Sequence, residues 1–133
     1  KTPQRDSTEV IALKYALKEK IPVIAICRGL QLVHTYFGGN LASGDSGFVT
    51  EHKATNHLID INGLSRAVNS YHTNYLVEES ISDNFEIFAR NKKDNSVEGL
   101  RNRNILAMMW HPERDTEFAE WNKLLIEHFL NNE

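Results

Sequence analysis

An uninterrupted apolar run that ends at the only cysteine of the chain does most to limit the possible folds. Residues 21–26 are apolar at every position without alternation, which predicts a strand covered on both faces, as in a parallel sheet. Cys27 follows directly, and apolar positions then recur at helical spacing until Gly38. Residues 6–20 carry the start signal and the apolar spacing of an earlier helix. The predicted order is helix, buried strand, sharp turn and helix.

The second half of the chain contains shorter apolar stretches. Residues 105–110 are again continuously apolar and end at His111, and residues 118–129 have the spacing of an amphipathic helix. Short, partly alternating stretches predict antiparallel or edge strands at residues 57–61, 84–90 and 96–100, with a hairpin loop at 101–104. Because strands and helices interleave, we expect one α/β domain over residues 1–133, with a three-layer open sheet that is mostly parallel.

Composition and charge narrow the functional classes. The 133 residues are 41% hydrophobic, which is ordinary for one domain with its own core. The formal net charge is -3 and no stretch gathers basic residues, so nucleic acid is not an expected partner. No apolar run reaches membrane-spanning length, so we do not expect a membrane partner. One cysteine cannot form an internal disulfide, which favours a reducing, cytoplasmic compartment.

Cys27 stands where a strand turns directly into a helix. A nucleophile at such an elbow needs small neighbours two residues before and after it, and Ala25 and Gly29 supply them. The elbow places the sulfur at the carboxyl edge of the sheet and at a helix N-terminus, which favours the reactive thiolate. A buried, unreactive cysteine is the alternative, because free cysteine packs like a small hydrophobic residue.

The residues after the second buried strand supply the partners that a thiol nucleophile needs. His111 can act as the base, and Glu113 can orient its ring and stabilise its charge. Pro112 between them restricts the backbone, so both side chains are presented from one turn. The alternative is a histidine at a strand end followed by a solvated glutamate.

The six histidines also allow a metal site to be considered. No HExxH or CxxC spacing is present, so we expect neither a metal nor a cofactor. His34 is expected to be a packed or surface residue, and Trp110 to belong to the core beside the site. Two groupings could in principle hold a metal: Glu51 and His52 with His57, or His72 with His111 and Glu113.

Four ordered blocks resemble the signature blocks of class I glutamine amidotransferases, and within them the γ-glutamyl hydrolase branch. The blocks are Ala-Ile-Cys-Arg-Gly-Leu-Gln at 25–31, Val-Asn-Ser-Tyr-His at 68–72, Asp-Asn-Ser-Val-Glu at 94–98 and Met-Trp-His-Pro-Glu-Arg at 109–114. The resemblance implies a flavodoxin-like fold and hydrolysis of a γ-glutamyl amide through a γ-glutamyl thioester. It implies that Cys27 is the nucleophile, His111 the base and Glu113 its orienting partner.

The same resemblance implies a binding site for the γ-glutamyl group. The backbone N–H of Arg28 would donate to the oxyanion. Further substrate-binding residues would be Gln31, Asn69, Ser70, Tyr71 and His72.

The chain departs from the family pattern in several places. Ala25 stands where many members have glycine, Thr73 and Asn74 where many have histidine and glutamine, and Met109 where glutamine is common. Family members also have further parallel strands and a second oxyanion donor upstream of the part that corresponds to Lys1. We therefore expect residues 1–133 to be the C-terminal portion of a longer domain, rather than one of two chains.

Three functions remain open at the level of the sequence. The favoured one is a stand-alone hydrolase that releases glutamate and an amine or amidate from a small γ-glutamyl substrate, such as γ-glutamyl-CDP-amidate. The second is a glutaminase subunit that supplies ammonia to a synthetase partner, which is not favoured. The third is a non-catalytic domain that binds a ligand in the same pocket. The sequence specifies neither the amine nor the oligomeric state.

Overall fold

A computed structural model describes residues 3–43, 53–61, 63–71, 74–114 and 120–131. The main sheet has the order β1-β8-β7-β6-β3-β4 in this part of the chain. Its strands are β1 (Val23–Ile26), β3 (Lys53–Ile61), β4 (Leu64–Tyr71), β6 (Glu86–Asn91), β7 (Val97–Arg101) and β8 (Ile105–Met108). A separate two-stranded ribbon pairs β2 (Leu41–Ser43) with β5 (Asn74–Leu76).

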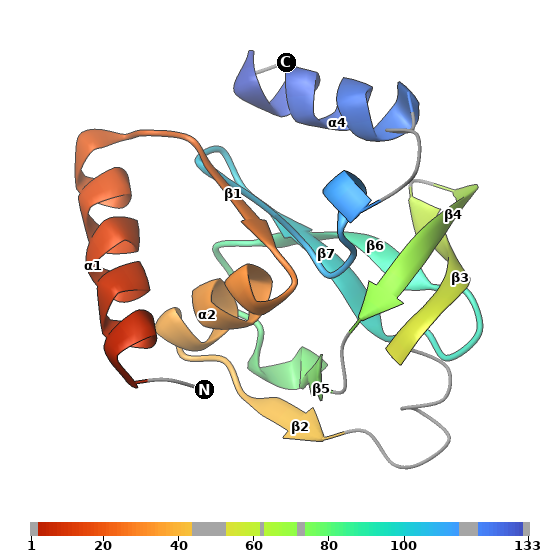
Figure 1. The fold of residues 1–133 in the computed structure, drawn as a ribbon, viewed down its shortest axis with the longest axis horizontal. Coiled ribbons are helices and arrows are strands. Elements are labelled where there is room, and N and C mark those ends of the chain that lie inside the picture. Colours follow the sequence, from red (N-terminus) through yellow and green to blue (C-terminus); the bar gives the residue numbers. More distant parts are fainter. Residues whose placement is uncertain (1–2, 44–52, 62, 72–73, 115–119, 132–133) are drawn as a thin grey trace.

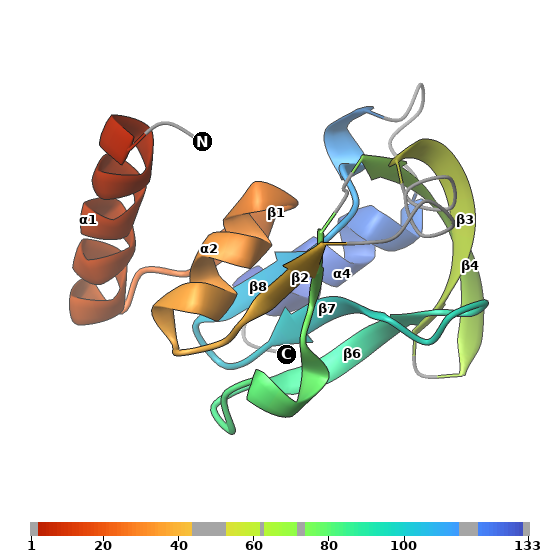
Figure 2. The same ribbon diagram turned by 90° about the horizontal axis from the view of Figure 1, so that it is seen from below.

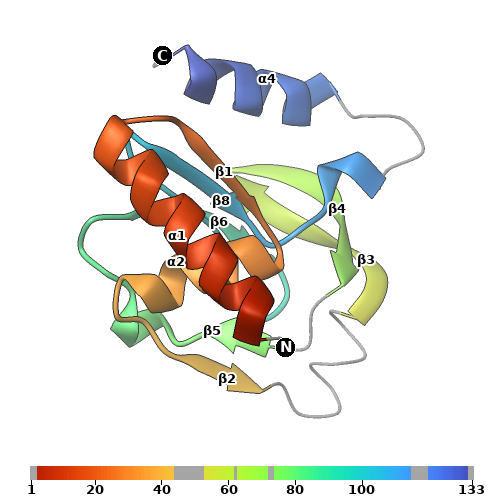
Figure 3. The same ribbon diagram turned by 60° about the vertical axis from the view of Figure 1, so that its left-hand side comes forward.

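Helices cover both faces of the main sheet (Figures 1 and 3). On one face, α1 (Pro3–Glu19) and α2 (Arg28–Tyr36) bury a core that includes Leu13, Val33 and Ile105. On the other, α4 (Glu120–Leu130) packs against a second core around Met108 and Trp110. The three layers and the α/β class are as predicted. Two short 3-10 helices, η1 (Glu78–Ser80) and η2 (Pro112–Arg114), complete the described elements.

The sheet is mixed, so the expectation of a mostly parallel sheet is wrong for the described strands. The two continuously apolar runs form β1 and β8, which pair in parallel with Val23 opposite Ile105. The other four pairings of the main sheet in the described residues are antiparallel. Short connections between consecutive strands account for most of them, because a short turn can join only antiparallel neighbours.

Local patterns located most elements within a few residues. The predicted loop at 101–104 joins β7 to β8, as expected. The helix expected over 6–20 begins earlier, at Pro3. The sequence interpretation missed β4, which forms a hairpin with β3 through a turn where Gly63 has a φ of 84°. This hairpin lies at the far end of the sheet from α1 (Figure 2).

No helix in the described part of the chain combines the length and the apolar character needed to cross a membrane.

Candidate active site

The backbone at Cys27 forms a sharp elbow between β1 and α2. Its φ of 53° and ψ of -104° lie in a region that non-glycine residues rarely adopt. The N–H of Cys27 donates to the carbonyl of Met108 at 2.8 Å, and the N–H of Gln31 donates to the carbonyl of Cys27 at 3.2 Å. The last bond of the strand ladder and the first bond of the helix therefore meet at this residue.

The small residues around the elbow allow the strand and the helix to approach closely. A Cβ atom placed on Gly29 would lie 3.3 Å from the Cβ of Ala25, which is a tight contact. A larger side chain at either position would push α2 away from β1. The role predicted for Ala25 and Gly29 is confirmed, as is the elbow itself.

The thiol of Cys27 is buried, with 6% of the residue exposed. Burial raises the pKa of this thiol above its ordinary value. The backbone N–H of Arg28 and the positive charges of Arg114 and Arg28 act in the opposite direction, and the charge of Glu113 raises the pKa further. The neutral thiol is therefore the resting form. The N–H of Arg28 at the helix N-terminus favours the thiolate, as expected, but burial outweighs it and the net shift of the pKa is upward.

His111 and Glu113 form a short hydrogen bond at the start of η2. The distance between His111 Nδ1 and Glu113 Oε2 is 2.7 Å. Burial raises the pKa of Glu113, but the bond to His111, its own backbone N–H and the charges of His111 and Arg114 outweigh burial and leave the pKa lowered. Since the ionised carboxylate only accepts hydrogen bonds, Nδ1 of His111 is the donor. Nε2 is then available to exchange a proton with a reacting group.

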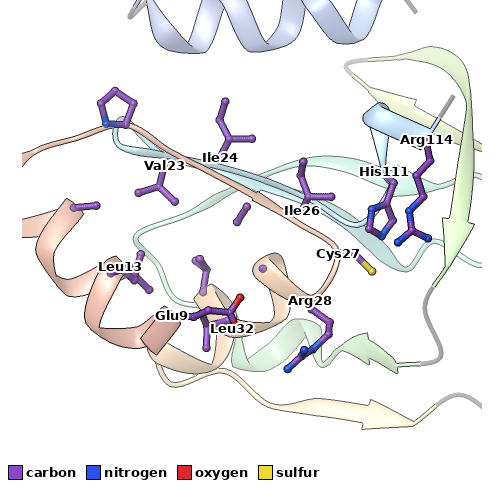
Figure 4. A pocket seen from close by; sticks show the side chains of 16 residues that line it. Glu9, Leu13, Val23, Ile24, Ile26, Cys27, Arg28, Leu32, His111 and Arg114 are labelled. Atoms are coloured by element: carbon purple, nitrogen blue, oxygen red, sulfur yellow. The ribbon is translucent and has the colours of Figure 1, made fainter. Parts of the chain in front are cut away.

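An open pocket of about 770 Å³ brings these elements together. It is lined by Cys27 and Arg28 at the elbow, by His111 and Arg114 around η2, by Glu9 of α1, and by apolar residues of α1, β1 and α2. Figure 4 shows the sulfur of Cys27 on the same side of the pocket as the His111 ring and the Arg114 guanidinium. The pocket thus brings together a thiol, an imidazole, two guanidinium groups and the carboxylate of Glu9.

Two of the predicted substrate residues make other contacts in this structure. Gln31 is buried, and its Nε2 lies 3.9 Å from the sulfur of Met109. Asn69 is also buried, and its side chain binds the main chain of His111. Ser70 and Tyr71 belong to β4, and His72 lies outside the described residues.

Arg114 is the functional candidate that the sequence interpretation missed. It lines the pocket, and its charge lowers the pKa of Cys27, which places its guanidinium within electrostatic reach of the sulfur. The signal was its position directly after Glu113 in the last signature block. Nothing in the spacing alone distinguished it from an ordinary surface arginine.

Several histidines lie away from this pocket. His34 is buried, and its Nε2 lies 2.9 Å from the carbonyl oxygen of Asn40. Burial lowers the pKa of His34, although the bond to Asn40 acts in the opposite direction. His57 Nε2 lies 3.2 Å from Glu98 Oε2 inside the protein. Among the side chains that the structure describes, no three His, Cys, Asp or Glu residues cluster as metal ligands would. Trp110 belongs to the core, as predicted.

The fold is that of solved glutamine amidotransferases. The family model for class-I glutamine amidotransferases matches residues 2–130, and the chain belongs to this family. A solved glutamine amidotransferase from Thermotoga maritima superimposes with a TM-score of 0.70 over 95% of this chain and 56% of its own, at 14% identity. That likeness supports the fold alone.

Two relatives match over nearly the whole chain. The glutamine amidotransferase-like protein YvdE of Lactococcus lactis is 31% identical over 97% of this chain, and the gamma-glutamyl-CDP-amidate hydrolase of Campylobacter jejuni is 30% identical over 93%. The chain spans 61% and 62% of the length of these relatives. The carbamoyl phosphate synthase small chain of Campylobacter jejuni is 28% identical over 92% of this chain and 32% of its own length.

Proposed function

We propose that the complete protein hydrolyses a γ-glutamyl amide with Cys27 as nucleophile, His111 as base and Glu113 as the partner of His111. The observation that carries this proposal is the strained elbow at Cys27, which opens into the same pocket as His111, whose Nδ1 is hydrogen-bonded to Glu113. Membership of the class I family and the similarity to a γ-glutamyl hydrolase support it.

The chemistry begins from a neutral thiol. Nε2 of His111 accepts the proton of Cys27 as the sulfur attacks the amide carbon, and Glu113 stabilises the imidazolium that forms. The backbone N–H of Arg28 donates to the oxyanion. The imidazolium then returns the proton to the departing nitrogen, which leaves as the amine and produces a γ-glutamyl thioester. A water molecule, deprotonated by His111, attacks the thioester, and glutamate and the thiol are released.

The positive charges in the pocket indicate the kind of leaving group. Arg28 and Arg114 line it beside Cys27 and outnumber its one carboxylate, that of Glu9, so a leaving group with negative charge gains electrostatic energy near the two arginines. A phosphoramidate fits this description, as does the substrate named for the Campylobacter jejuni hydrolase. We therefore propose a stand-alone hydrolase for an anionic amine or amidate.

A glutaminase subunit that passes ammonia to a synthetase is the second candidate. The similarity to a carbamoyl phosphate synthase small chain favours it. We prefer the hydrolase because of the arginines that line the pocket beside Cys27. A ligand-binding role without catalysis is not preferred, because all three reacting groups are present.

Two further expectations stay predictions. The first is that residues 1–133 are the C-terminal portion of a longer domain, and the second is the cytoplasmic location.

Substitution of the three proposed catalytic residues tests the function. In the complete protein, we expect Cys27→Ala to abolish release of glutamate from γ-glutamyl compounds, because the covalent route is lost. His111→Asn should lower kcat by about 10²- to 10⁴-fold, the usual contribution of a general base. Glu113→Gln should be milder, because the glutamate side chain is 53% exposed and water can replace part of its effect.

His128→Asn is the matched control, since this exposed histidine lies on α4 and does not line the pocket of Cys27. It should keep full activity. Circular dichroism should confirm that each variant is folded. A Cys27→Ala protein that still turns over substrate would exclude the thiol mechanism.

A further inference from the structure

Asn69 binds both main-chain groups of His111. Its Nδ2 donates to the carbonyl oxygen of His111 at 2.7 Å, and the N–H of His111 donates to Asn69 Oδ1, also at 2.7 Å. Asn69 belongs to β4 and is 6% exposed. It is separated from His111 by 42 positions in the sequence.

These two bonds replace a strand partner where the sheet ends. The paired part of β8 ends at Met108, and the N–H of Met109 still donates to the carbonyl of Glu98 at 2.8 Å. Past this point the His111 main chain needs other partners, because buried polar backbone groups are costly to leave unpaired. The primary amide of Asn69 supplies a donor and an acceptor in one plane, as the backbone of a neighbouring strand would.

Two sets of hydrogen bonds therefore restrain His111, one at its main chain and one at its ring. Asn69 holds the main chain from β4, while Glu113 binds Nδ1 of the ring at 2.7 Å. The bond to Glu113 restrains rotation of the ring but does not determine where its Cα atom lies. The two bonds to Asn69 attach the His111 main chain to β4, whereas the other bond to its carbonyl, from the N–H of Arg114 at 3.1 Å, lies within the turn of η2 itself.

We propose that Asn69 is a positioning residue, which sets the place of His111 relative to Cys27 through the main chain, and is not a substrate-binding residue. Its catalytic consequence rests on the proposed function. A displacement of the base by about 1 Å can lower the rate about 100-fold, because proton transfer requires close alignment. Substrate binding would change little, since both groups of the Asn69 amide are directed at the protein.

Two variants of the complete protein test this assignment. Asn69→Ala removes both bonds, and Asn69→Asp keeps the size and the acceptor but loses the donor. Asn91→Ala is the matched control: Asn91 is also buried, with 2% exposed, and its Oδ1 accepts from the N–H groups of Lys93 and Asp94 in the turn after β6. It therefore also loses two bonds to the main chain, but not at the pocket.

The first measurement is hydrogen exchange at the His111 amide, which does not depend on activity. We expect exchange to accelerate at least about tenfold in Asn69→Ala and to stay unchanged in Asn91→Ala. The second measurement is the hydrolysis of a γ-glutamyl amide. We expect kcat to fall about 100-fold in Asn69→Ala with KM within about twofold of the parent protein.

Three results would overturn the assignment. Unchanged exchange at His111 would show that Asn69 does not hold the main chain. A raised KM with an unchanged kcat would make Asn69 a substrate-binding residue after all. An equal loss of kcat in Asn91→Ala would point to general stability. A parent protein with no activity on any γ-glutamyl compound would instead refute the proposed function, and the exchange data would still decide the placement of His111.

Discussion

At the scale of single residues, burial and charge act on Cys27 in opposite directions. Burial raises the pKa of the thiol and dominates, while the N–H of Arg28 and the charge of Arg114 lower it. The raised pKa favours the neutral thiol, so under the proposed function a base must remove its proton during attack. This differs from cysteine enzymes whose resting form is the thiolate.

The direction of the pKa shift predicts how Cys27 reacts with iodoacetamide. Because the thiolate is the form that reacts, a raised pKa should make labelling at pH 7 slower than that of a cysteine in a short peptide. The labelling rate should increase as the pH rises through the raised pKa. Mass spectrometry of the intact complete protein over a series of pH values would follow it.

Two substitutions should shift the pH dependence of the Cys27 labelling rate in opposite directions. Arg114→Gln removes a positive charge that favours the thiolate, so the profile should move to higher pH. Glu113→Gln removes a negative charge that disfavours it, so the profile should move to lower pH. Labelling that is faster than the peptide at pH 7 would mean that burial does not dominate at Cys27.

At the scale of elements, the contact between β1 and α2 controls the geometry of the elbow. The Cβ of Ala25 lies 3.3 Å from where a Cβ on Gly29 would be. Alanine normally stabilises a helix relative to glycine by about 1 kcal/mol. At this position the steric contact opposes that gain.

A double-mutant cycle separates the two effects. We expect Gly29→Ala to lower the free energy of unfolding by about 1–3 kcal/mol, the usual cost of overpacking. Ala25→Gly in the same protein should recover most of this loss, because it removes the other partner of the contact. Urea denaturation of the parent, both single variants and the double variant gives the coupling energy. A Gly29→Ala protein that is as stable as its parent would show that β1 and α2 can separate without cost.

At the scale of the whole molecule, the pocket at Cys27 is lined by residues from distant parts of the chain. Cys27 and Arg28 come from the junction of β1 and α2, while His111 and Arg114 come from the region between β8 and α4. β1 has β8 as its neighbour and forms one edge of the described sheet. The pocket also extends along β1 toward α1. Under the proposed function, its volume of about 770 Å³ would hold a leaving group larger than ammonia.

This pocket predicts a preference among substrates. We expect the complete protein, without a synthetase, to hydrolyse the γ-glutamyl derivative of a larger, anionic amine or amidate at least about tenfold more efficiently than glutamine. That ratio in kcat/KM corresponds to about 1.4 kcal/mol of transition-state binding. Glutamate release would be measured across neutral and anionic γ-glutamyl compounds, with Cys27→Ala as the blank.

The same panel distinguishes the two enzyme candidates. Arg114→Gln should reduce the preference for the anionic compound while leaving glutamine less affected, because its charge is expected to contact the leaving group. Glutamine as the best substrate, or activity only after a synthetase is added, would favour the glutaminase subunit.

Short-range patterns made most of the elements and the central site residues predictable. The apolar runs before Cys27 and His111 indicated two buried strands, and these strands pair in parallel. Gly29 and Ala25 indicated the elbow, because the steric requirement acts over two residues on either side of Cys27. His111 and Glu113 are close in the chain, so their hydrogen bond follows from a local turn.

Contacts between distant segments could not be predicted in the same way. The sequence alone determined the helices, the main strands other than β4, the elbow and the pairing of His111 with Glu113, because each depends on a few neighbouring residues. Only the tertiary structure decided the mixed sheet, the raised pKa of Cys27 and the bonds from Asn69 to His111. Strand pairing, burial and electrostatics depend on which remote residues meet, and hydrophobic spacing carries little information about that.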